Sequence, residues 1–270
     1  MTPPLPEFER PPVDEMVMGV QFDPLANLRA AHFGLFWTRI QQEYPHTEDQ
    51  GPLVPTIEPS EILQPSPPSV PIPFAIPPLF RCWFLNEGKT ELIQVQRDRF
   101  LRNWRRVKGD EPYPRFSRLA HDFQRAWHEF LTFTGDQKLG SVKVNQCELT
   151  YINYIEKGAG WSELGELHEV FPFLRPRERE GLLPSPEALS WQARYRLPEG
   201  RGRLHVEMYP VFRGREMRLA LSLILTARGS PAEDSPERIF AWFDLSHEWI
   251  VRAFTELTSP AVHKLWGKKT

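Results

Sequence analysis

The sequence predicts an α+β protein in which long amphipathic helices cover a mainly antiparallel sheet. Segments in which apolar and polar residues alternate follow one another across short turns, which is typical of neighbouring antiparallel strands. Other segments repeat apolar residues at intervals of three and four, which is typical of helices with one buried face. Together these patterns favour a layer of helices on an antiparallel sheet.

The region from Trp191 to Trp266 contains both patterns in succession. Its alternating segments predict three strands at 191–197, 203–209 and 217–226, and Pro210 marks an edge, an end or a bulge of the second. An apolar stripe from Pro236 to Leu257, preceded by the N-cap residue Ser235, then predicts a long helix. A stripe this rich in aromatic residues needs a sheet face to cover, and the preceding strands are its natural partner.

The N-terminal part combines extended and helical segments. Residues 1–12 predict a proline-rich extended arm, 13–22 a strand and 28–44 a helix. Ten prolines between Pro52 and Pro78 exclude a helix or a central strand. The large apolar residues between these prolines favour a segment docked on the protein over a flexible linker.

The middle of the chain predicts a hairpin, a second long helix and a long strand. The hairpin pairs 80–86 with 91–98, the helix spans 116–131 and the strand spans 142–155. In this strand the buried positions change phase, which a β-bulge near Asn145 would explain. These elements extend the antiparallel pattern into the first half of the chain.

The order of these elements divides the chain into an arm and two halves. Residues 1–12 form the arm, and 13–110 form an N-terminal α+β half that includes the proline-rich segment 52–78. Residues 111–270 form a C-terminal α+β half. The pattern fits one continuous sheet as well as two similar β-α-β-β lobes, and no residue-level repeat decides between them.

Composition limits the class of protein. The chain has 270 residues, 40% of them hydrophobic, and a formal charge of −2, which gives no overall attraction to nucleic acid or to an anionic membrane. No apolar run could span a bilayer and the start lacks a signal-peptide pattern, so we expect a cytoplasmic protein without membrane contact. For Cys82 and Cys147, buried free thiols are favoured over a disulfide or a metal pair.

Short motifs are spread along the whole chain. They are Pro11–Glu15 with Gly19–Leu25, Leu35–Trp37 with Glu43–Pro45, Ile93–Gln96 with Asn103–Arg105, and the closing Ser259–Gly267. These motifs resemble a sporadically distributed bacterial protein family whose members are uncharacterised. The resemblance brings no established catalytic residues. It implies patchy, horizontally transferred gene content, which is common among bacterial conflict, defence and toxin-neutralising genes and is an association only.

No motif for catalysis or metal binding is complete. Three His-Glu pairs occur, but a zinc-protease helix needs a second histidine four residues after the first. The pairs are His128-Glu129, His168-Glu169 and His247-Glu248, and the required positions hold Thr132, Pro172 and Val251. We therefore assign these histidines structural or surface roles and expect neither a metal nor a cofactor.

Basic and aromatic residues concentrate after the predicted hairpin. They are Arg97, Arg99, Phe100, Arg102, Trp104, Arg105 and Arg106, continued by Lys108, Arg115 and Arg118. Arginines interleaved with aromatic rings can bind phosphates and stack on bases, so this region is a candidate nucleic-acid site. The favoured alternative is a solvated turn region with Phe100 and Trp104 buried, because nearby acidic residues dilute the charge.

The tail of the chain is a second candidate surface. Val262, Leu265 and Trp266 share one face of a short predicted helix. This face either packs back on the core, which is favoured for a terminus with a large aromatic residue, or binds a partner.

These features lead to three functional hypotheses. The first is a non-catalytic interaction protein with a protein partner, such as the neutralising or accessory partner in a bacterial conflict system. The second is a nucleic-acid-binding protein that uses the Arg97–Arg118 region. The third is an enzyme or small-ligand binder whose pocket, between helices and sheet, holds titratable groups such as His121, His205 or Glu207. The oligomeric state is left open.

Overall fold

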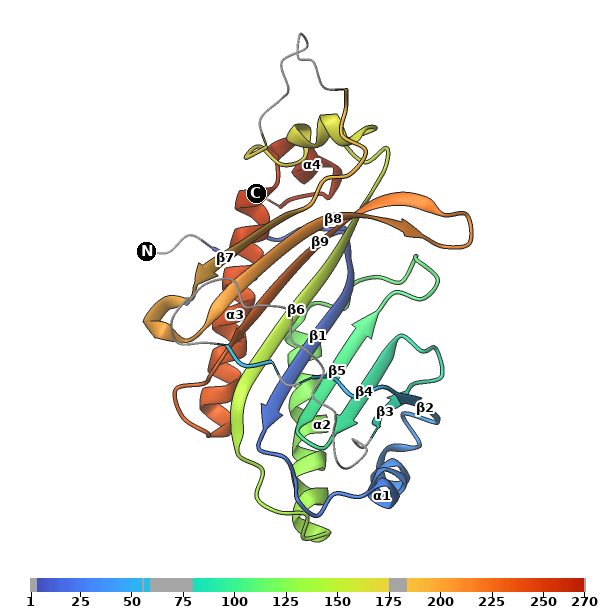
Figure 1. Ribbon diagram of the computed structural model, residues 1–270, viewed down its shortest axis with the longest axis vertical. Coiled ribbons are helices and arrows are strands. Elements are labelled where there is room, and N and C mark those ends of the chain that lie inside the picture. The colour runs from blue at the N-terminus through green and yellow to red at the C-terminus, as the bar shows by residue number, and fades with distance from the viewer. Residues whose placement is uncertain (1–3, 55, 59–79, 175–183, 270) are drawn as a thin grey trace.

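The computed structural model describes residues 4–54, 56–58, 80–174 and 184–269 (Figure 1). Nine strands form one antiparallel sheet in the order β2-β3-β4-β5-β1-β6-β9-β8-β7. The strands are β1 (Val13–Phe22), β2 (His46–Gln50), β3 (Arg81–Leu85), β4 (Glu91–Gln96), β5 (Arg99–Arg105), β6 (Val144–Glu156), β7 (Trp191–Arg196), β8 (Arg203–Arg213) and β9 (Arg218–Gly229). The predicted fold class, α+β with a mainly antiparallel sheet, is confirmed.

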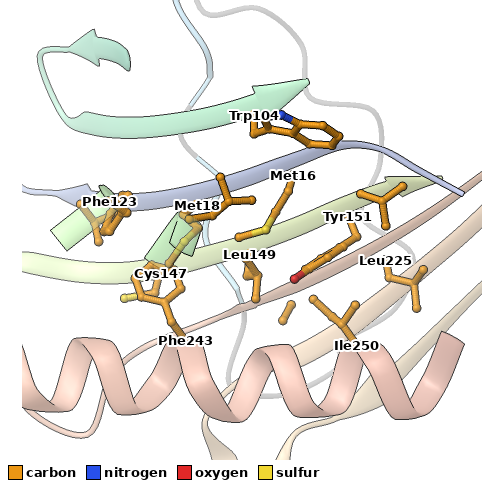
Figure 2. Packing of buried hydrophobic residues seen from close by; sticks show 14 of the residues in the cluster. Met16, Met18, Trp104, Phe123, Cys147, Leu149, Tyr151, Leu225, Phe243 and Ile250 are labelled. Atoms are coloured by element: carbon orange, nitrogen blue, oxygen red, sulfur yellow. The ribbon is translucent and has the colours of Figure 1, made fainter. Parts of the chain in front are cut away.

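Two long helices lie on one face of the sheet, behind it in Figure 1. The helices are α1 (Ala30–Ile40), α2 (Phe116–Asp136), α3 (Pro236–Leu257) and α4 (Pro260–Leu265), with 3-10 turns at Leu164–Glu169 and Pro198–Gly200. Figure 2 shows side chains of β1, β6 and β9 meeting those of α3 between the two layers. Among the described residues no helix is both long enough and apolar enough to cross a membrane.

When the chain is divided after α2 instead of near residue 110, its two parts, called the first and the second half below, contribute a similar succession of elements, with α1 and β2 added in the first. The first supplies β1, the meander β3-β4-β5 and then α2, and the second supplies β6, the meander β7-β8-β9 and then α3. In each half the first strand pairs with the last strand of the meander, and β1 pairs with β6 at the centre. The sheet therefore runs without a break from one half to the other.

Several local predictions are confirmed in detail. Helix α3 begins at Pro236 and ends at Leu257, and the Ser235 hydroxyl caps it by accepting the Arg238 amide. The pairing of β1 with β6 skips Asn145, which is the predicted bulge. Pro210 lies two residues beyond the last pair between β7 and β8, where β8 has a neighbour on one side only.

Two strands were not predicted. Residues 99–105, interpreted above as a basic surface or a solvated turn region, form β5 in the interior of the sheet, and Arg97 and Asp98 make the tight turn from β4. The alternation of apolar and polar residues in β5 was not recognised, because a charged residue, Arg102, lies on the helix-covered face between Phe100 and Trp104. Glu91 and Asp122 pair with its buried guanidinium there. The other strand is the edge strand β2.

The opposite face of the sheet carries polar side chains, and the start of the proline-rich segment lies across it. The Gln96 side chain bonds both the N–H and the C=O of Leu53. The Gln146 side chain accepts from the Glu58 amide and donates to the Thr56 carbonyl. The predicted docking is confirmed for the described residues 53, 54 and 56–58, called the strap below. Residues 55 and 59–78 of the segment lie outside the described residues.

Candidate ligand-binding site

A cavity of about 400 Å³ lies between α3, the first turn of α2, the paired ends of β1 and β6, and the N-terminal arm. Most of its wall is apolar, and a few polar side chains converge in it. The apolar walls include Phe8, Val13, Phe116, Leu225, Ile250 and Phe254, and the polar groups include Tyr113, Tyr151, Asn153 and His247. Figure 2 shows Tyr151 between β6 and α3, near Leu225 and Ile250.

The polar groups form a continuous hydrogen-bonded chain. The hydroxyls of Tyr113 and Tyr151 are 2.9 Å apart, and the Tyr151 hydroxyl is 2.9 Å from His247 Nδ1. At the other end the Tyr113 hydroxyl lies 3.6 Å from Met16 Sδ. The chain joins the loop before α2 to β6 and α3, so three separate elements position it.

Burial keeps this chain uncharged. It lowers the pKa of His247 from 6.5 to about 4, so the imidazole is neutral at pH 7. Burial also raises the pKa of both Tyr113 and Tyr151, so neither hydroxyl ionises near neutral pH. The Phe116 ring stacks on the imidazole with centroids 3.9 Å apart and planes 5° from parallel, which fixes its orientation.

The N-terminal arm forms one wall of the cavity. It is held by the C-terminal tail, because the Glu9 amide donates to the Gly267 carbonyl and the Lys269 amide to the Glu7 carbonyl. The Arg115 guanidinium donates to the Phe8 carbonyl at 2.7 Å. The Phe8 ring packs edge-on against Phe254. From residue 4 onward the predicted extended arm is therefore a fixed part of the site.

The tail residues chosen from the sequence divide between core and surface. Val262 is fully buried, and Trp266 packs against Phe8 and Phe254. Leu265 alone is exposed, at 52%. The tail thus packs back on the core, the favoured alternative, and whether Leu265 contacts a partner stays a prediction.

The basic and aromatic candidates do not share one surface. Phe100, Arg102 and Trp104 are buried on the helix-covered face. On the other face, the Arg99 guanidinium donates to Gln21 and the Arg105 guanidinium lies over the Trp83 ring. Arg97 and Arg106 lie beyond opposite ends of β5, where they donate to the carbonyls of Leu25 and Glu111.

The titratable residues named for a pocket lie elsewhere. His121 is exposed on α2, and His205 pairs with Glu58 on the strap-covered face, where Glu207 also lies. The cavity instead contains His247, for which a structural or surface role was predicted. Its spacing, four residues after Phe243 and three before Ile250, places it beside the apolar stripe of α3 and could have revealed it.

Metal binding and catalysis by a cysteine nucleophile find little support in the described residues. No three His, Cys, Asp or Glu side chains among them are arranged to hold a metal ion. Cys82 and Cys147 are buried free thiols, as predicted. Burial raises the pKa of Cys82 to about 12 and also raises that of Cys147, which disfavours the nucleophilic thiolate.

Comparison with known proteins adds no relative: no family model, curated protein or solved structure matches the chain.

Proposed function

We propose that the cavity binds a small, largely apolar molecule that carries one uncharged polar group. The observation that carries this proposal is the neutral chain Tyr113–Tyr151–His247 inside an apolar cavity of about 400 Å³. Small-molecule sites commonly combine apolar walls with a few convergent polar groups in a volume of about 300–1,000 Å³. The apolar walls would supply affinity, and the chain would orient the polar group of the ligand.

The charges at the rim support an uncharged ligand. The Arg115 guanidinium is engaged with the carbonyls of Phe8 and Glu9, and the Glu7 carboxylate pairs with Lys269. The partners beside His247 are the neutral hydroxyls of Tyr113 and Tyr151, so removing a charged ligand group from water there is costly. A hydroxyl, carbonyl or amide avoids that cost, because the neutral imidazole and phenols both donate and accept hydrogen bonds.

The test uses N-phenyl-1-naphthylamine, an uncharged aromatic amine whose fluorescence increases in apolar sites. We expect saturable binding that 1-naphthalenemethanol displaces more strongly than 1-naphthoate does. Ser117→Trp should abolish binding, because Ser117 is an exposed residue at the cavity wall where a large ring would block entry. His128→Leu removes an exposed histidine of α2 and serves as the control, with binding unchanged.

Two results would contradict the proposal. One is the absence of saturable binding by the wild-type protein. The other is binding that Ser117→Trp leaves intact, because the probe would then occupy a different apolar surface. The interaction role predicted from the sequence, with a protein partner in a conflict or defence system, stays a prediction.

A further inference from the structure

The cavity contains one polar side chain, Asn153, that lies outside the hydrogen-bonded chain of tyrosines and histidine. Asn153 belongs to β6, two residues after Tyr151 and on the same face of the sheet, and it lines the cavity. Only 2% of the residue is exposed. A buried amide needs hydrogen-bond partners for its nitrogen and for its oxygen, so the partners of both atoms decide what this side chain can do.

The amide nitrogen of Asn153 is already engaged. Asn153 Nδ2 donates to the backbone carbonyl of Leu223 at 3.0 Å, across the pairing of β6 with β9. A carbonyl can only accept a hydrogen bond, so the NH2 group and not the amide oxygen must face Leu223. This bond fixes the orientation of the amide.

The amide oxygen of Asn153 has no such partner. No described residue donates a hydrogen bond to Asn153 Oδ1. The oxygen is nevertheless not sealed inside the protein, in contrast to the unpaired hydroxyl of Ser246 on α3. Because Asn153 lines the cavity, its oxygen borders that space as a fixed acceptor without a donor.

The chain Tyr113–Tyr151–His247 imposes no comparable preference on a ligand. Each hydroxyl can rotate and the neutral imidazole has two tautomers, so the hydrogen bonds of the chain can run in either direction. The chain therefore accommodates a ligand group that donates as well as one that accepts. Asn153, whose oxygen is held in one orientation, can distinguish the two kinds of group.

We propose that Asn153 selects ligands whose polar group donates a hydrogen bond, such as an alcohol, a phenol or an amide N–H. This inference rests on the proposed function and narrows the ligand from any uncharged polar group to a hydrogen-bond donor. A ketone of the same shape leaves Oδ1 covered and unpaired, and such a loss commonly weakens binding by about tenfold or more. The apolar walls contact both kinds of ligand alike.

The test compares 1-(1-naphthyl)ethanol with 1-acetylnaphthalene, a ketone that has the same heavy atoms and cannot donate. Each compound displaces N-phenyl-1-naphthylamine from the whole chain, and the readout is the ratio of the two dissociation constants. Wild type should bind the alcohol about tenfold more tightly than the ketone. In Asn153→Leu, which has a similar size and no polar side-chain atom, this preference should fall about tenfold. The different hydration of the two compounds cancels, because it is the same for both proteins.

Tyr151→Phe is the matched control, because it removes another polar atom of the same cavity from the same strand. It should weaken the binding of both compounds and leave their ratio within about twofold of wild type, since the chain itself does not discriminate. Circular dichroism melts show whether each variant is folded. Asn153→Leu also removes the bond to Leu223, so the wild-type ratio tests the inference by itself if this variant does not fold.

Two outcomes would overturn the inference while the proposed function stands. One is saturable binding of the probe by wild type with equal affinity for the alcohol and the ketone. The other is a preference for the alcohol that folded Asn153→Leu retains, which would assign the selection to another group in the cavity. Absence of saturable probe binding overturns the proposed function and this inference together.

Discussion

The two interfaces between helix and sheet have the same plan and different interiors. Helices α2 and α3 begin at Phe116 and Pro236, and each covers its own half of the sheet. Counted from these first residues, four pairs of buried or half-buried side chains occupy matching positions. They are Leu119 and Ile239, Phe123 and Phe243, Trp127 and His247, and Phe130 and Ile250.

The third of these pairs marks the difference. Trp127 is buried, with its ring centroid 5.4 Å from Phe100 and 6.0 Å from Phe22. At the matching position His247 is smaller and polar, bonds Tyr151 and borders the cavity. At this position the interface of the first half is therefore filled by a large buried ring, whereas the interface of the second half borders a cavity.

The largest expected effect is the loss of stability when the interface between α2 and the sheet is disrupted. Trp127→Ala should lower the free energy of unfolding by about 3–5 kcal/mol, because it removes a buried aromatic ring and leaves a cavity. His247→Ala should cost only about 1 kcal/mol, because the ring already borders a cavity and loses one hydrogen bond. Urea unfolding at pH 7 measures both, and equal losses would show that the two interfaces are packed alike.

Acid should lower the stability of the protein through His247, which borders the cavity under α3. Its pKa is about 4 in the folded protein and 6.5 when exposed, so between these values only the unfolded chain binds the proton. Stability should therefore fall as the pH drops below 6.5, by about 2 kcal/mol at pH 5. His247→Phe should remove this part of the pH dependence and His128→Phe should not, as urea unfolding at pH 7 and pH 5 would show. An unchanged dependence in His247→Phe would mean that the imidazole is protonated in the folded state.

The fold could be predicted where the signal is local. The limits of α3 and the bulge at Asn145 follow from periodicity within one segment. Strand β5 was missed because Arg102 interrupts its apolar face, and the carboxylates that neutralise this arginine come from β4 and α2. The polar residues of the cavity were not identified from the sequence for a similar reason. Tyr151 lies 38 residues from Tyr113 and 96 from His247, and no local pattern joins residues so far apart.

A smaller effect should come from the middle of the hydrogen-bonded chain. Tyr151→Phe removes the hydroxyl that links Tyr113 to His247, and leaves both without their shared partner. We expect a loss of about 1–2 kcal/mol at pH 7 and weaker probe binding. Tyr154→Phe is the matched control, since its half-buried ring lies on the opposite face under Arg213. If both variants behave alike, the chain contributes neither stability nor ligand orientation.

The smallest effect concerns a feature in which the two halves should behave alike. Gln96 of the first half and Gln146 of the second each bond the strap twice through one side-chain amide. Gln96→Ala and Gln146→Ala should each cost about 1 kcal/mol, because the lost bonds are to backbone groups that water can partly satisfy. Hydrogen exchange of the strap amides should rise in both variants. A large cost for Gln146→Ala alone would indicate that the second half depends on the strap while the first does not. The asymmetry between the halves would then extend to both faces of the sheet.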